Sequence, residues 1–319
     1  MQVAVVVYDG VFDSGLAAIL DVLDNANTLG KQIDEPAPTW NVTVVGPAPQ
    51  VRTAAGFLVA PEPLEHAQTA DLLVVAAFAG YQPAALLDYV GGDASRPIRD
   101  LIARTRDRGA TVAAACAGTF LLAEAGILDG LRATTTWWLS PAFRARYPQV
   151  RVDHSQMVIT CEGITTAGAA FGHIDLALAI VRAGSPSLAD LVARYLVVDE
   201  RPAQSAYTIP SALAQSDPTV AAFERWIREH LAEPISMADA AKAVGVSERT
   251  LQRSVRRTTG TPPIRFVQDL RIERARHLLR TTGLSMEVIS QKVGYQRPDT
   301  LRVLLRERTG KTASALRGR

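Results

Sequence analysis

Short apolar runs alternate with amphipathic stretches over the first two thirds of the chain. Four runs rich in Val, Leu and Ala have the length and composition of buried strands, namely VAVVVYDG (3–10), WNVTVVG (40–46), DLLVVAAFAG (71–80) and ATVAAAC (110–116). Helical spacing of apolar residues lies between or after them, at 16–27, 83–89 and 97–108. Strands that alternate with helices indicate a parallel sheet with helices on both faces. The pattern therefore predicts an α/β fold.

The last hundred residues carry only helical patterns, and part of them is an internal repeat. ISMADAAKAVGV (235–246) aligns without gaps on LSMEVISQKVGY (284–295), at an offset of 49 residues. Each copy predicts a helix capped by Ser236 or Ser285, a turn at Gly245 or Gly294, and a second helix. The stretch between the copies, 262–283, predicts one long amphipathic helix. We expect an all-α domain with two helix-turn-helix motifs.

The apolar periodicity lapses between these two patterns. Pro, Ser and Gln collect in the stretch 199–218, as in an exposed connection between domains. We place the boundary at 211–217, which gives a first domain over 1–210 and a second over 217–319. Two domains also suit a length of 319 residues with 48% hydrophobic content.

The net charge of +2 conceals a division between the two domains. Residues 1–210 hold 14 Lys and Arg against 21 Asp and Glu, whereas residues 211–319 hold 20 against 11. A basic carboxyl-terminal third attached to an acidic body favours binding of the DNA backbone by that third. A solvated basic face is the alternative.

The second helix of each repeat copy places polar residues on one side and apolar residues on the other. Arginine can read guanine and glutamine can read adenine in a major groove, and we expect both helices to enter double-stranded DNA about one helical turn, roughly 34 Å, apart. The predicted DNA-contacting residues are Arg249, Gln252, Arg253 and Arg256 in the first copy, and Arg297, Arg302 and Arg306 in the second.

Other features limit the class of protein. No apolar run approaches membrane-spanning length, and the start of the chain reads as a buried strand rather than a signal peptide, so we expect a cytoplasmic protein without membrane association. The two cysteines build no disulfide framework, and the five histidines are scattered. We therefore expect no metal site and no cofactor.

The stretch VAAACAGTFLLAEAG (112–126) predicts a strand, a sharp turn at Cys116 and a helix. Such an elbow aims helix N-terminal amides at the side chain, which lowers a thiol pKa and also makes an anion site. Cys116 is then a pocket-lining residue, an inert packed residue or a nucleophile. His173, two residues before Asp175, is either an acid or base or a hydrogen-bonded structural residue.

Most of the stretch 1–200 resembles the PfpI-like, class I glutamine amidotransferase-like domains. The resemblance is carried by CAGTFLLAEAGILDGLRATTTWW (116–138), YDGVFDSGLAAILDVLDNAN (8–27) and TTAGAAFGHIDLALAIV (165–181). It implies a flavodoxin-like parallel sheet sandwiched by helices. Residues 218–318 resemble the AraC/XylS-type DNA-binding module, in which the glycine turns, RIERARHLL (271–279) and RERTG (306–310) stand in register. Ala313 and Leu316 replace the usual closing proline and tyrosine.

The chain differs from the catalytic members of the first family at each position that carries a partner of the elbow cysteine. Gly15 stands near the acidic position, with Asp13 two residues earlier, and Ala117 replaces the histidine of peptidase-like members. Thr136 stands where regulatory relatives carry a histidine. A thiolate without a base is a poor catalyst, and we therefore assign no catalytic residue, with Cys116 as a candidate only.

Together these features predict an AraC-type transcriptional regulator of the GlxA-like subgroup. The resemblance implies that a small nitrogenous metabolite, such as an amino acid, an amine or a betaine, controls it through a pocket formed by Asp13, Cys116, Thr136, Trp137 and His173. Trp137 and Trp138 either roof this pocket or pack in a core or interface. We expect a homodimer. The alternatives are a cysteine-dependent amidohydrolase or carbonyl-modifying enzyme fused to a DNA-binding module, and a first domain that serves only for dimerisation.

Overall fold

The computed structural model describes residues 1–80, 82–199, 201, 203–204 and 207–317. The chain divides into two compact units, Met1–Gln204 and Ser205–Arg319. The division lies before the connection expected at 211–217, because that stretch contains most of a short helix, α8 (Pro210–Ala214), which packs on α9, α11 and α12 of the second unit. Residues 318–319, which close the predicted second domain, lie outside the described residues.

A seven-stranded sheet forms the centre of the first unit, in the order β10-β11-β7-β6-β1-β2-β5. Its strands are β1 (Gln2–Val6), β2 (Asn41–Gly46), β5 (Glu62–Pro63), β6 (Leu72–Val75), β7 (Thr111–Ala115), β10 (Val158–Cys161) and β11 (Ile164–Ala167). All neighbours pair in parallel except β10 and β11. The predicted parallel sheet is confirmed, and the antiparallel edge strand β10 was not predicted. Two small sheets join β3 (Val51–Arg52) to β4 (Leu58–Val59) and β8 (Arg132–Ala133) to β9 (Arg151–Val152).

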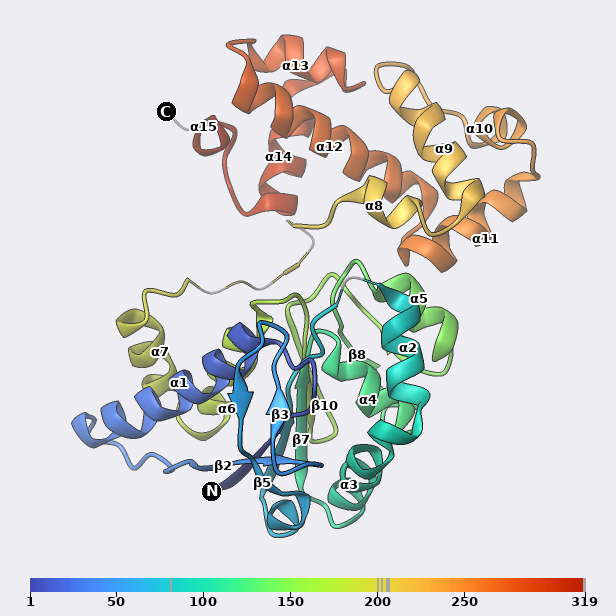
Figure 1. Ribbon diagram of the computed structural model, residues 1–319. Coiled ribbons are helices and arrows are strands. Elements are labelled where there is room, and N and C mark those ends of the chain that lie inside the picture. The colour runs from blue at the N-terminus through green and yellow to red at the C-terminus, as the bar shows by residue number, and fades with distance from the viewer. Residues whose placement is uncertain (81, 200, 202, 205–206, 318–319) are drawn as a thin grey trace. The chain divides into compact units, whose positions relative to one another are not determined.

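Helices cover both faces of this sheet (Figure 1). Successive residues of β1 alternate between two cores: Val3 and Val5 face one, and Ala4 and Val6 face the other. The first core is completed by α1 (Asp13–Leu29), α6 (Gly172–Gly184) and α7 (Pro186–Tyr195). The second is completed by α2 (Pro83–Gly91), α3 (Arg96–Asp107), α4 (Gly118–Glu124) and α5 (Ser140–Arg146). Short 3-10 helices lie at Gly30–Gln32, Leu64–Ala67 and Asp93–Ser95.

The second unit is helical and contains the predicted repeat. Its helices after α8 are α9 (Pro218–Glu229), α10 (Met237–Ala243), α11 (Glu248–Thr259), α12 (Pro263–Thr281), α13 (Met286–Lys292), α14 (Pro298–Thr309) and α15 (Ala313–Leu316). The pairs α10–α11 and α13–α14 are the two helix-turn-helix motifs. Ser236, Ser247 and Ser285 cap their helices as side-chain acceptors. Gly245 and Gly294 adopt φ values of +73° and +79°, which glycine reaches without steric cost.

No helix among the described residues is both long and apolar enough to cross a bilayer. Within the same residues, no three or more His, Cys, Asp or Glu side chains gather as a metal ion would require.

Candidate functional site

Cys116 occupies the predicted elbow between β7 and α4. Its φ is +54°, a left-handed conformation that side chains other than glycine rarely adopt. The Cys116 amide donates to the Ala167 carbonyl at 2.8 Å, and the Cys116 carbonyl accepts from the Thr135 hydroxyl at 2.8 Å. Both bonds hold the backbone in this conformation, and strain that is held in this way is common at functional sites.

The elbow helix packs tightly against the neighbouring strand. A Cβ atom on Gly118 would lie 2.7 Å from the Val75 carbonyl oxygen and 3.0 Å from that of Ala76. Only glycine fits at the start of α4, and this close approach draws the elbow into the core. The Cys116 side chain is consequently only 6% exposed.

Burial decides the protonation state of the thiol. It raises the pKa of Cys116 to about 12, although the Ala117 amide and the Thr136 hydroxyl act in the opposite direction. The prediction that the elbow lowers this pKa was wrong, because loss of solvation outweighs the amide at the helix start. At neutral pH Cys116 is a thiol and not a thiolate, which makes it a poor nucleophile.

His173 fills the space beside Gly15, the residue that stands near the acidic position of the catalytic family members. A Cβ atom on Gly15 would come within 2.7–2.8 Å of three atoms of the His173 ring. The imidazole is fully buried, and its Nδ1 lies 2.6 Å from the Ala170 carbonyl oxygen, so Nδ1 carries the proton and donates it. Burial lowers the pKa of His173 to about 4. These observations favour the structural role for this histidine over the acid or base.

Two buried polar atoms near the first turn of α1 have no hydrogen-bond partner among the described residues. One is Nε2 of His173, and the other is Oδ1 of Asp13. The second carboxylate oxygen of Asp13 accepts from the Ala55 amide at 2.9 Å, so Asp13 holds the β3–β4 loop and makes no hydrogen bond to Cys116. Both unpartnered atoms are acceptors, because Nε2 of a histidine protonated on Nδ1 carries a lone pair.

The segment after β8 closes the other side of the elbow. Thr136 is fully buried beside the thiol, and Trp137 is 9% exposed. The two indole rings of Trp137 and Trp138 meet edge to face, with centroids 5.5 Å apart. Of the five residues predicted to form a ligand pocket, the structure thus buries four and places Asp13 on the first turn of α1, partly exposed.

Gln204 supports this segment, and the sequence did not predict its role. Its side-chain amide is fully buried and donates to the Thr134 hydroxyl at 3.1 Å and to the Thr135 carbonyl at 3.0 Å. Gly168 makes room for it, since a Cβ there would collide with the amide. Gln204 lies in a polar stretch without periodicity, so no local signal marks it as buried.

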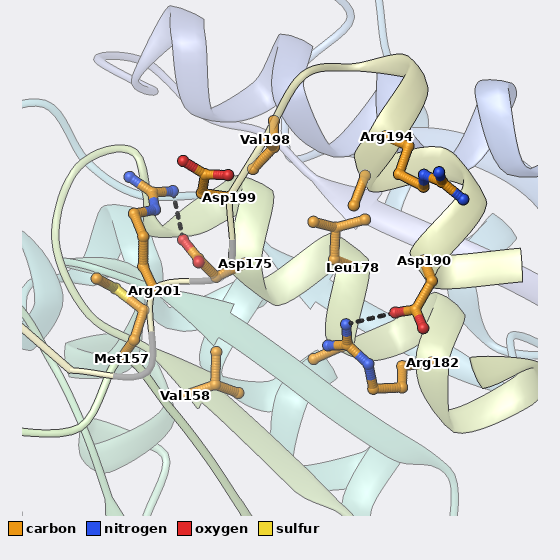
Figure 2. Close-up of a pocket in the computed structure, with 12 residues that line it drawn as sticks. Met157, Val158, Asp175, Leu178, Arg182, Asp190, Arg194, Val198, Asp199 and Arg201 are labelled. Carbon is orange, nitrogen blue, oxygen red and sulfur yellow. Dashed lines mark hydrogen bonds and ion pairs between the residues drawn. The ribbon is translucent and has the colours of Figure 1, made fainter. Parts of the chain in front are cut away.

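A separate cavity of about 640 Å³ lies beside α6 and α7 (Figure 2). None of the five predicted pocket residues lines it. Arg201 pairs with Asp175 at 2.5 Å and Arg182 pairs with Asp190 at 3.3 Å across its walls. With Arg194 and Asp199 added, the lining carries three arginines and three aspartates. These charges balance, and most of them already pair with each other.

The predicted DNA-contacting residues are all exposed on α11, on α14 or, for Arg297, at the start of α14. The apolar residues of the same helices, Leu251, Val255, Leu301 and Leu305, are fully buried. Among the described residues no hydrogen bond or ion pair engages the side chains of Arg249, Arg253, Arg256, Arg297 or Arg306. Arg302 instead pairs with Asp299 at 2.6 Å, and Gln252 donates to Glu248 at 3.2 Å.

Comparisons with known proteins agree with the division of the chain into two units. The DJ-1/PfpI family matches residues 1–183, and the family described as "Helix-turn-helix domain" matches residues 240–319. The chain is 31% identical to the HTH-type transcriptional regulator CdhR of Pseudomonas aeruginosa over 264 residues, which cover 81% of this chain and 75% of the relative. It is 26% identical to the HTH-type transcriptional regulator GlxA of Rhizobium meliloti over 215 residues, 66% of each chain.

Solved structures show the fold of the first unit. DJ-1beta of Drosophila melanogaster is 19% identical with a TM-score of 0.51, over 62% of this chain and 98% of the other. An AraC family transcriptional regulator from Pseudomonas putida is 19% identical with a TM-score of 0.50, over 61% and 98%. The chain therefore belongs to the DJ-1/PfpI family and, with its helix-turn-helix domain, is a transcriptional regulator of the AraC type.

Proposed function

We propose that the first unit binds a small nitrogenous metabolite at the elbow without converting it, and that binding controls how the second unit sits on a promoter. The residues assigned to this site are Asp13, Cys116, Thr136, Trp137 and His173. A ligand alters the regulator if it binds one arrangement of the protein more tightly than another. A dimer of such chains would offer two copies of each DNA-reading unit.

One observation carries the choice of ligand. Three buried polar atoms of the assigned residues have no hydrogen-bond partner among the described residues: His173 Nε2 and Asp13 Oδ1 are acceptors, and the Thr136 hydroxyl can donate or accept. An unsatisfied buried acceptor costs about 1–3 kcal/mol, and a ligand with N–H donors removes that cost. Binding without chemistry is supported by the protonated Cys116 thiol, which donates no hydrogen bond to Asp13.

The exposed faces of α11 and α14 are the proposed DNA-reading surfaces. Arg249, Gln252, Arg253 and Arg256 serve one half of the site, and Arg297, Arg302 and Arg306 serve the other. The five arginines without partners among the described residues are free to meet phosphates or base edges.

A thermal-shift screen on the wild-type protein and Cys116→Ala tests the proposal, because a ligand that binds only the folded state raises the melting temperature. The panel holds amino acids, amines, betaines, amides and aldehydes. We expect amino acids or amines to stabilise both proteins, and betaines, which lack N–H donors, to stabilise neither. Betaine binding alone would indicate recognition by Trp137 through cation–π attraction instead. Stabilisation or ligand loss that requires the cysteine would favour the enzyme alternative.

A further inference from the structure

Helix α12 belongs to both halves of the DNA-binding unit. Its first part, with Phe266, Val267 and Leu270, packs in the core of the first helix-turn-helix motif. Its second part, with Ile272, Ala275, Leu278 and Leu279, packs in the core of the second. Arg271 is the residue at which the helix passes from one core to the other.

The side chain of Arg271 contacts both halves. Its Nη2 donates to the Glu233 carbonyl at 2.8 Å, in the turn that follows α9 of the first half. Its guanidinium carbon lies 5.4 Å from the centre of the Tyr295 ring, in the turn between α13 and α14 of the second half. A second link joins Arg228 of α9 to Glu273 of α12 at 2.8 Å.

Gly294 brings the two halves into direct contact. A Cβ atom on Gly294 would collide with the Leu231 carbonyl oxygen at the end of the first half and with the Arg271 guanidinium. Gly245, the equivalent residue of the first motif, has almost the same φ, but a Cβ there would meet nothing within 4 Å. The two glycines therefore share a local role in the turn, and only Gly294 has a second role between the halves.

We propose that Arg271 and Gly294 form a joint that fixes the distance and rotation between α11 and α14. The protein then reads the spacing of its two DNA boxes as well as their sequences. A hinged unit could adjust to boxes at several spacings, whereas a fixed unit accepts one, near a helical turn of about 10 base pairs. This inference rests on the proposed DNA-reading faces of α11 and α14.

In vitro selection from a random duplex library with the full-length protein tests the joint. We expect the wild-type protein to enrich two boxes at one spacing, and to lose roughly tenfold or more in affinity when one or two base pairs are inserted between them. Gly294→Ala and Arg271→Gln should enrich the same boxes at several spacings. The insertion should lower the DNA affinity of these variants by less than about threefold.

Matched variants separate the joint from general effects. Gly245→Ala carries the same left-handed backbone cost as Gly294→Ala, and Arg274→Gln removes the same charge from an exposed position of α12. Both should keep the wild-type spacing. If Gly294→Ala does not fold, Tyr295→Leu weakens the joint more mildly, with Tyr295→Phe as its control because the tyrosine hydroxyl has no partner among the described residues.

Two different results would contradict the proposed joint. Paired boxes at one spacing in the wild-type protein and in every folded joint variant would show that the halves are fixed by something else. A wild-type selection without paired boxes would reject the two proposed reading faces together with the joint.

Discussion

The elbow of the first unit and the recognition helices of the second unit share one local structure, a helix that follows a sharp turn. The two regions use this structure for opposite purposes. Residues 118–123 of α4 are all buried, and burial favours the uncharged forms of Cys116 and His173. Helices α11 and α14 bury one apolar side and expose unpaired cations on the other. Burial converts potential nucleophile and base into neutral packing groups, while exposure keeps the arginines available for DNA.

This difference predicts distinct responses to substitution. Changes at the elbow should act on stability and on ligand binding, because each group there touches others on several sides. Changes on the recognition faces should act on DNA binding alone.

The largest expected effect concerns the two cysteines, one buried at the elbow and one half-buried in β10. With a pKa of about 12, Cys116 should be ionised to only about one part in ten thousand at pH 8. We expect iodoacetamide to label Cys161 in the folded protein at least about a hundredfold faster than Cys116. In the Cys161→Ser variant, mass spectrometry measures labelling of Cys116 alone, and the unfolded protein gives the reference rate. Rapid labelling there would show an ionised thiol and would favour the enzyme alternative.

Acid should weaken the first unit. The pKa of His173 is about 4 in the folded protein against 6.5 for a free histidine, so the unfolded chain binds the proton more tightly. The free energy of unfolding should fall by about 3 kcal/mol as the pH drops from 6.5 to 4, and His154, with the same pKa for the same main cause, adds to the fall.

Tryptophan fluorescence can follow this loss. Trp226→Phe leaves Trp40, Trp137 and Trp138, all in the first unit, as reporters of urea unfolding. In that background His173→Leu should remove the part of the pH dependence that belongs to His173. An identical pH dependence with and without His173 would contradict the buried neutral imidazole.

Gly118→Ala should destabilise the first unit by about 1–3 kcal/mol, because the new methyl group meets two carbonyl oxygens of the neighbouring strand. Gly172→Ala, at the start of α6, is the control, since the nearest atom there would be 3.6 Å away. Equal losses in chemical denaturation for the two variants would show that the elbow helix has room to shift.

An effect of similar size, but confined to DNA binding, is expected on α11. Arg253→Ala should weaken binding to the selected sequence by about 1–3 kcal/mol, as for loss of a base contact. Arg257→Ala removes the same charge from the same helix, but Arg257 pairs with Asp217 at 2.7 Å and should matter less. Fluorescence anisotropy on selected and random duplexes distinguishes the roles: equal losses on both would identify Arg253 as a phosphate contact.

The sequence predicted those parts of the structure that follow from local periodicity. The four strands, the two repeat copies and the long helix α12 appear where the apolar spacing places them. The caps at Ser236, Ser247 and Ser285 are also local and were equally predictable. For the same reason the exposed faces of α11 and α14 could be named residue by residue.

Contacts between distant segments could not be predicted in this way. Gln204 reaches the segment 134–135 from a polar stretch, and the buried Arg308 of α14 pairs with Asp269 of α12 at 3.5 Å. The His173 ring over Gly15 joins residues far apart in the chain. The raised pKa of Cys116 depends on how deeply the elbow is buried, which its own sequence does not record. The five residues of the proposed ligand site could be named from the sequence, but the protonation states of Cys116 and His173 could not.

The most direct test of binding without chemistry is recovery of the ligand. The compound that stabilises the wild-type protein is incubated with it in slight excess, and NMR then follows both the compound and any product over several hours. We predict that the compound remains unchanged with both proteins and that calorimetry gives one binding site per chain for the wild-type protein and for Cys116→Ala. A product that forms with the wild-type protein and not with Cys116→Ala would contradict the account and identify the elbow as an active site.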